Sequence, residues 1–141
     1  MQDKQYPLEG SPFYRMKSLH KLAQILHIEV KKLLKLEESL NINPEKHYRV
    51  FIQGPKKREI QHPFGTQIAA VQKRLKILLT RIKPPEYVQS GRKGISYVDN
   101  AAHHCENSFC IPMDIKKFYE STKGEVVFQF FFYRMKMTSD L

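Results

Sequence analysis

Apolar residues recur at helical spacing in three stretches of this chain, which predicts helices at residues 19–26, 29–40 and 66–82. Ser18 directly precedes the first stretch and can cap it. The third stretch is the clearest, because its apolar residues form one stripe along a helix. These are Ile68, Val71, Leu75, Leu78, Leu79 and Ile82. We expect that stripe to pack and the basic side chains outside it to meet solvent.

A β-hairpin is predicted between the second and third helices. Residues 48–52 and 58–62 are rich in residues typical of strands, and Gly54 and Pro55 between them favour a turn. The two strands would therefore pair in antiparallel fashion.

The last third of the chain gives weaker signals. Residues 95–105 indicate a short helix, and residues 125–136 fit a helix or a strand. The apolar run at residues 109–115 predicts a buried strand next to Asp114, although Pro112 favours an edge or irregular strand.

Charge narrows the choice of partner. The chain of 141 residues carries 24 Lys and Arg against 14 Asp and Glu, a formal net charge of +10. Such an excess favours a polyanion, either nucleic acid or a membrane surface, although a basic protein without such a partner is the alternative. No apolar run approaches the roughly 20 residues that span a bilayer, and the first residues lack a signal-peptide core. We therefore expect a cytoplasmic protein with no membrane partner.

The cysteines give little support for a metal site. Cys105 and Cys110 are the only two in the chain, and a zinc site would need a second pair of ligands. His103 and His104 lie beside Cys105, so a metal cluster is an alternative. We expect two reduced, partly buried thiols instead.

Asp114 is the strongest candidate for a metal-binding residue. An acid beside an apolar strand is costly to bury without a partner. At the end of a strand it can hold a hard cation, and Mg²⁺ favours one or two carboxylates together with substrate phosphates. A helix cap or a salt bridge is the alternative role.

Several motifs, in order along the chain, resemble those of reverse transcriptases, and of retron enzymes in particular. The segment SPFYRMKS at residues 11–18 looks retron-like, and KKREI at residues 56–60 resembles the basic fingers hairpin. GRKGIS at residues 91–96 resembles the loop before the palm. NAAHH at residues 100–104 fits the retron signature Asn-Ala-x-x-His, and DIKKFY at residues 114–119 resembles the first palm motif.

The resemblance implies an α+β fold and a nucleotidyltransferase activity. The fold would comprise a helical N-terminal extension at residues 1–45, a fingers subdomain at 46–105 and part of the palm at 106–141 of a right-hand polymerase. The parent activity would be RNA-directed DNA polymerisation, with Mg²⁺, deoxynucleotides and a structured non-coding RNA as template and primer. The resemblance further implies a branched RNA-linked cDNA and a role in antiphage defence, and it leaves any accessory protein undefined.

The resemblance also assigns roles at the catalytic centre. Asp114 would be the catalytic residue and a metal ligand. Arg58, with Lys57 and Lys56, would neutralise the triphosphate of the incoming nucleotide, since the arginine fork binds two phosphate oxygens. A solvated charge run is the alternative for the two lysines.

Further substrate and RNA contacts follow from the same resemblance. Ile115 would contact the nucleotide, and Tyr119 would lie under its sugar and exclude a ribose 2′-hydroxyl; a core aromatic is the alternative for Tyr119. The RNA contacts would come from Arg92, Lys93, Asn100 and His104. A helix-packing role is the alternative for Asn100 and His104.

The chain departs from the family after the first palm motif. The second metal-binding motif, Tyr-x-Asp-Asp, is absent, and residues 138–141 read like the start of a further helix. Because one carboxylate cannot hold two metal ions, we expect a truncated chain that is inactive alone. A group II intron-like reverse transcriptase and a non-catalytic RNA-binding module are the other interpretations.

Overall fold

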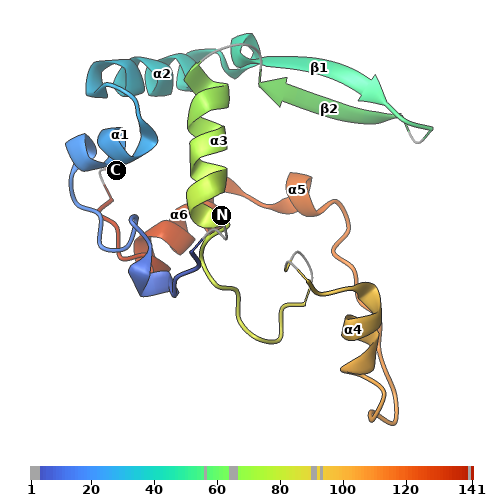
Figure 1. The fold of residues 1–141 in the computed structure, drawn as a ribbon. Helices are drawn as coiled ribbons and strands as arrows, with labels where there is room; N and C mark the ends of the chain where they lie inside the picture. The colour runs from blue at the N-terminus through green and yellow to red at the C-terminus, as the bar shows by residue number, and fades with distance from the viewer. Residues whose placement is uncertain (1–3, 56, 64–66, 90–91, 93, 140) are drawn as a thin grey trace.

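The computed structural model describes residues 4–55, 57–63, 67–89, 92, 94–139 and 141. The described part is mixed helix and strand, compatible with the predicted α+β class, and Figure 1 shows α3 upright at its centre. In chain order the elements are η1 (Leu8–Gly10), α1 (Leu19–Leu26), α2 (Val30–Ile42), η2 (Pro44–His47), β1 (Tyr48–Gln53), β2 (Arg58–Pro63), α3 (Gln67–Leu79), α4 (Tyr97–Ala102), α5 (Phe118–Ser121), α6 (Gly124–Gln129) and the π-helix η3 (Phe130–Arg134).

The first two helices begin and end for local reasons. The Ser18 hydroxyl accepts a hydrogen bond from the Lys21 N–H at 3.4 Å, so the predicted N-cap is confirmed. His27 ends α1 in the left-handed conformation, with φ of 57°, and its N–H bonds back to the last turn. Pro44 then opens the short 3₁₀ helix after α2, which keeps the α-helix from continuing.

The predicted hairpin is confirmed. Strands β1 and β2 are antiparallel, with Tyr48 opposite Pro63 and Gln53 opposite Arg58. They form the one sheet found among the described residues. Gln72 of α3 donates to the Tyr48 hydroxyl at 2.9 Å, which ties the base of the hairpin to the central helix. The other end of the hairpin therefore extends away from α3, as Figure 1 shows.

Helix α3 ends earlier than its apolar stripe predicts, and the predicted first residue, Thr66, lies outside the described residues. Tyr6 forms a parallel bridge with Ile82, in which its N–H donates to the Arg81 carbonyl and its own carbonyl accepts from the Lys83 N–H. The Tyr6 hydroxyl also donates to the Leu78 carbonyl at 2.6 Å, and burial raises its pKa. Backbone pairing with the N-terminal segment thus replaces the last helical turn.

The core joins segments that are distant in sequence. Phe13, Leu26, Leu78 and Met135 are buried together, and Phe131 packs against them. The C-terminal segment is fixed by backbone bonds to the N-terminal one: the Arg15 N–H donates to the Met135 carbonyl, and the Thr138 N–H to the Met16 carbonyl. The division at residues 45 and 105 stays a prediction, and one core draws on all three parts.

The predicted buried strand at residues 109–115 is wrong. These residues form no strand, and Phe109, Ile111 and Met113 are 78%, 72% and 91% exposed. A buried strand needs a neighbour for its backbone groups and a surface to cover its side chains. Among the described residues β1 and β2 pair only with each other, so no strand partners this segment, and its exposed side chains show that no surface covers it.

The prediction of partly buried thiols is also wrong. Cys105 and Cys110 are both free and exposed, because they lie in a continuous exposed stretch at residues 103–115. Within the described ranges, no group of three His, Cys, Asp or Glu side chains could hold a metal ion.

Residues 125–136, which fit a helix or a strand by pattern, are largely helical. α6 continues directly into η3. Phe131 meets Phe13 edge-on in the core at 6.5 Å between ring centroids. Phe128 and Phe132 stack on each other at 5.6 Å, and both are exposed. The segment therefore carries aromatic residues both on the side that packs against the core and on the side that is exposed.

The short helix predicted at residues 95–105 is present as α4, which is limited to six residues by its caps. The Ser96 hydroxyl accepts from the Asp99 N–H, while the Asp99 carboxylate accepts from the Ser96 N–H at 2.7 Å. The Ser96 hydroxyl also donates to the Asp99 carboxylate at 2.6 Å, and this hydrogen bond, followed by that of the Ser96 N–H, lowers the pKa of Asp99.

Acid should therefore loosen α4. Because the pKa of Asp99 is lower folded than unfolded, its stabilising effect is complete above the unfolded value, about pH 4, and is lost as pH falls through the lowered one. The protection factors of the α4 amides, which are the exchange rates corrected for the intrinsic pH dependence, should fall over that range in the native chain. Asp99→Asn should have lower protection factors at neutral pH, and these should no longer fall as the solution is acidified. An unchanged profile in Asp99→Asn would contradict this role.

Candidate functional site

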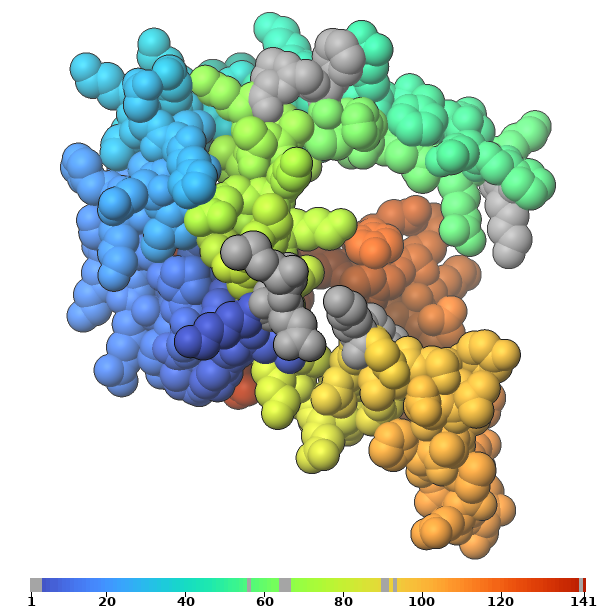
Figure 2. Space-filling view, in the orientation of Figure 1, coloured from blue at the N-terminus to red at the C-terminus, as the bar shows by residue number. Residues whose placement is uncertain are grey.

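An open cleft of about 1050 Å³ lies between the hairpin and α5. Residues 58–61 of β2 line one side and residues 117–120 line the other. Figure 2 shows the opening between the green hairpin and the orange segment that contains α5. The hairpin is tied to α3 at its base by the Gln72–Tyr48 hydrogen bond, and its other end extends over the cleft.

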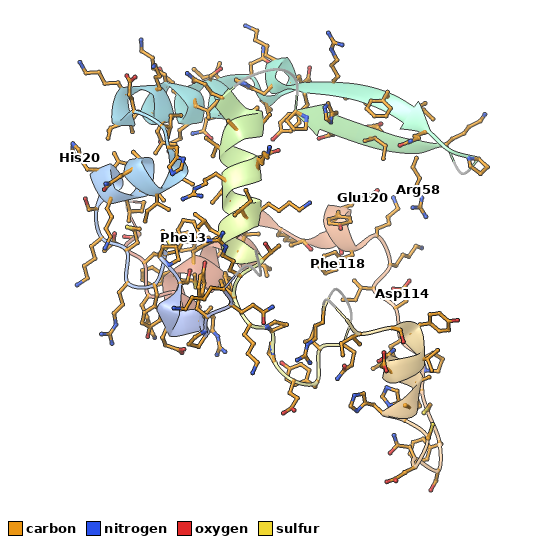
Figure 3. The ribbon with its side chains drawn as sticks, in the orientation of Figure 1. Phe13, His20, Arg58, Asp114, Phe118 and Glu120 are labelled. Atoms are coloured by element: carbon orange, nitrogen blue, oxygen red, sulfur yellow. The ribbon has the colours of Figure 1, made fainter. Side chains whose placement is uncertain are left out.

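The hairpin supplies Arg58 at the first position of β2, opposite Gln53. The side chain is exposed, and in Figure 3 it points from the hairpin toward the segment of Phe118 and Glu120. An exposed guanidinium at the rim of a cleft can bind an anion through two parallel hydrogen bonds.

The opposite wall is built around one strained residue. Lys117 precedes α5 in the left-handed conformation, with φ of 54° and ψ of 49°. Its Nζ lies 2.8 Å from Glu120 Oε2, and the hydrogen bond and charge of Glu120 raise the pKa of Lys117. Phe118 and Tyr119 follow, with their rings edge to face at 5.4 Å. The wall therefore offers an ion pair and two aromatic rings.

Two of the residues assigned to substrate from sequence share this cleft. Arg58 comes from the hairpin and Tyr119 from α5, and both line it. Tyr119 is 90% exposed, so the alternative role as a core aromatic is wrong for this structure.

The other residues assigned to the catalytic centre lie nearby in sequence but outside the lining. Asp114 and Ile115 are exposed on the segment that leads into α5, and Figure 3 shows Asp114 below Arg58. Lys57 is exposed in the hairpin turn, with φ of 46°. Lys56 lies outside the described residues.

The residues assigned to RNA are not gathered at the cleft. Asn100 and His104 are exposed on and just after α4, which projects from the lower right of Figure 1. That exposure counts against the helix-packing alternative for both. Arg92 bonds the Glu86 carbonyl at 3.2 Å in a separate loop, and Lys93 lies outside the described residues.

Sequence reasoning missed Lys117 and Glu120 as cleft residues. Their spacing of three positions could have indicated an ion pair, because residues three apart lie on one side of a helical turn. The position of the turn relative to the hairpin is a tertiary property, and no local pattern encodes it.

Asp114 has the exposed side chain that a magnesium ligand needs. Its carboxylate is exposed and makes no ion pair with any other described residue. Mg²⁺ is commonly held by one or two carboxylates plus substrate phosphates, so Asp114 fits one ligand of such a site.

Comparison with known proteins adds a relative. The chain is 28% identical over 125 residues to the retron Se72 reverse transcriptase of Salmonella heidelberg (strain 579083-10). It is similar to a reverse transcriptase. The aligned region covers 88% of this chain and 33% of the relative, so the chain spans about a third of that protein's length. No family model matches the chain, and no solved structure matches it.

The similarity supports a relationship to reverse transcriptases over a partial region. In the described part of the chain, no helix has both the length and the apolar content needed to cross a membrane.

Proposed function

We propose that this chain supplies the fingers hairpin and first palm segment of a retron-type reverse transcriptase, an RNA-directed DNA polymerase. The main support is the position of two residues assigned to the nucleotide. Arg58 and Tyr119, assigned to the incoming nucleotide from separate motifs, line the same cleft although 60 positions separate them in the sequence.

The cleft suits a deoxynucleoside triphosphate. Arg58 binds the phosphates, because a guanidinium pairs with two anionic oxygens and keeps its charge at any physiological pH. Tyr119 lies beneath the sugar, where its ring leaves no room for a 2′-hydroxyl. The net charge of +10 supports binding of a structured RNA template and its cDNA through their phosphates.

Asp114 would hold Mg²⁺ in the complete polymerase, together with carboxylates from elsewhere in the enzyme. When bound, the ion neutralises charge on the nucleotide phosphates. Asp114 itself supplies an exposed carboxylate on the segment that leads into α5, whose aromatic rings line the cleft.

Exposed apolar side chains support a place for this chain inside a larger polymerase. Met113, Val126 and Tyr133 are 91%, 56% and 59% exposed, and Phe128 and Phe132 present a stacked pair beside the last two. A soluble monomer rarely leaves so large an apolar surface open. The proposed occupant is the remaining polymerase polypeptide, since the similar reverse transcriptase is about three times as long as the aligned region.

Tyr119→Val tests the assignment in a complete polymerase that contains this segment. Because the ring acts by excluding the wrong sugar, its removal should admit ribonucleotides and lower the ratio of deoxy to ribo incorporation. The kcat/KM values for the deoxy and ribo forms of one nucleotide give that ratio.

Tyr97→Val is the matched control, because Tyr97 is 87% exposed on α4 and lies outside the cleft lining. It should leave the sugar ratio unchanged. If Tyr119→Val slows incorporation of both sugars equally, Tyr119 does not select the sugar.

A further inference from the structure

Lys117 holds a conformation that glycine would adopt at lower cost. Its left-handed backbone, with φ of 54°, brings the β-carbon close to the following carbonyl group. A long side chain at this position costs more than glycine, and here that side chain forms an ion pair. The ammonium is 2.8 Å from Glu120 Oε2, and the two side chains are 67% and 68% exposed.

This ion pair faces the cleft opposite Arg58. Exposed pairs of this kind contribute little to stability, because water and salt screen them and both side chains lose freedom. The pair can therefore open at small cost. A phosphate group carries more negative charge than a carboxylate and offers more acceptor oxygens.

We propose that Lys117 is a second phosphate-binding cation of the cleft and that Glu120 is its internal counter-ion, displaced when a polyphosphate binds. The inference rests on the proposed function, since it deepens the assignment of the cleft to a nucleoside triphosphate. Arg58 then binds the phosphates from the hairpin side of the cleft, and Lys117 binds them from the α5 side. Glu120 sets the affinity by competing for the Lys117 ammonium.

Inorganic triphosphate is the probe, titrated calorimetrically into the 141-residue chain and its variants. Lys117→Ala should weaken binding about three- to tenfold, as expected for loss of a charge-assisted contact in a partly solvated site. Glu120→Gln should strengthen binding about two- to fivefold, because it frees the lysine. That gain should shrink in the Lys117→Ala background, since the two changes act on one interaction.

Two further variants separate binding from structure. Lys117→Gly relieves the strained backbone, so its Tm should not fall, while its affinity should drop as in Lys117→Ala. The control is Glu29→Gln, which breaks a similar exposed pair, Lys32–Glu29 at 2.6 Å, outside the cleft. It should leave the affinity unchanged.

The outcomes distinguish the inference from the proposed function. If Arg58→Ala weakens binding but Lys117→Ala and Glu120→Gln do not alter it, the inference fails and the nucleotide cleft stands. If Glu29→Gln strengthens binding as much as Glu120→Gln does, the effect is general charge and the inference fails. If none of the cleft variants, Arg58→Ala included, alters binding, both fail.

Discussion

Asp114→Asn, in a complete polymerase that contains this segment, is expected to reduce primer extension to background. The amide keeps the shape of the side chain but loses the negative charge that a Mg²⁺ ligand needs. RNA binding should be retained or slightly strengthened, because the change removes a negative charge from a basic chain. Extension of a labelled primer and RNA binding at fixed salt measure the two effects.

Glu29→Gln is the control for this prediction, since it neutralises an exposed carboxylate that pairs with Lys32 outside the cleft and is not assigned to metal. It should extend primers at close to the native rate. Primer extension by Asp114→Asn at the native rate would show that Asp114 is not a metal ligand. It would remove the catalytic part of the proposal.

Phe13→Ala is expected to lower the free energy of unfolding of the chain by about 3–5 kcal/mol. Phe13 is 1% exposed, and it packs between α1, α3 and the C-terminal segment through Leu26, Leu78 and Met135. Its removal would leave a cavity where distant segments meet, and the edge-on contact with Phe131 would also be lost. Urea denaturation followed by circular dichroism measures the change.

Phe109→Ala gives the comparison for a phenylalanine outside the core. Phe109 is 78% exposed, so its loss should change the free energy of unfolding by no more than about 0.5 kcal/mol. Equal effects of the two substitutions would contradict the placement of the core at Phe13.

The sequence predicts elements well where their causes are local. Ser18 marks a helix start because a hydroxyl before an apolar periodic segment can accept a backbone N–H. The hairpin is likewise set by two strand-like runs around Gly54, which adopts φ of 75° in the turn. Helix α3 is predicted by its apolar stripe, except at its end, where backbone pairing between Tyr6 and Ile82 stops the helix.

Properties that depend on distant segments could not be predicted in this way. Residues 109–115 are apolar enough to be buried, but burial requires a surface that the local pattern does not specify. The meeting of Phe13 with Phe131 joins the two ends of the chain. For the candidate site, motifs single out Arg58 and Tyr119, whereas their common cleft and the Lys117–Glu120 pair depend on how the hairpin and α5 are placed.

Mapping nucleotide contacts on the 141-residue chain by NMR tests whether the cleft between the hairpin and α5 binds a nucleotide. Addition of a deoxynucleoside triphosphate with Mg²⁺ should shift amide resonances of residues 58–61 and 117–120, which line the cleft. Arg58→Ala should suppress these shifts, whereas Arg134→Ala, a control at an exposed arginine outside the lining, should not. Shifts confined to other elements, or shifts at the cleft that Arg58→Ala leaves intact, would contradict a nucleotide site at which Arg58 binds the phosphates.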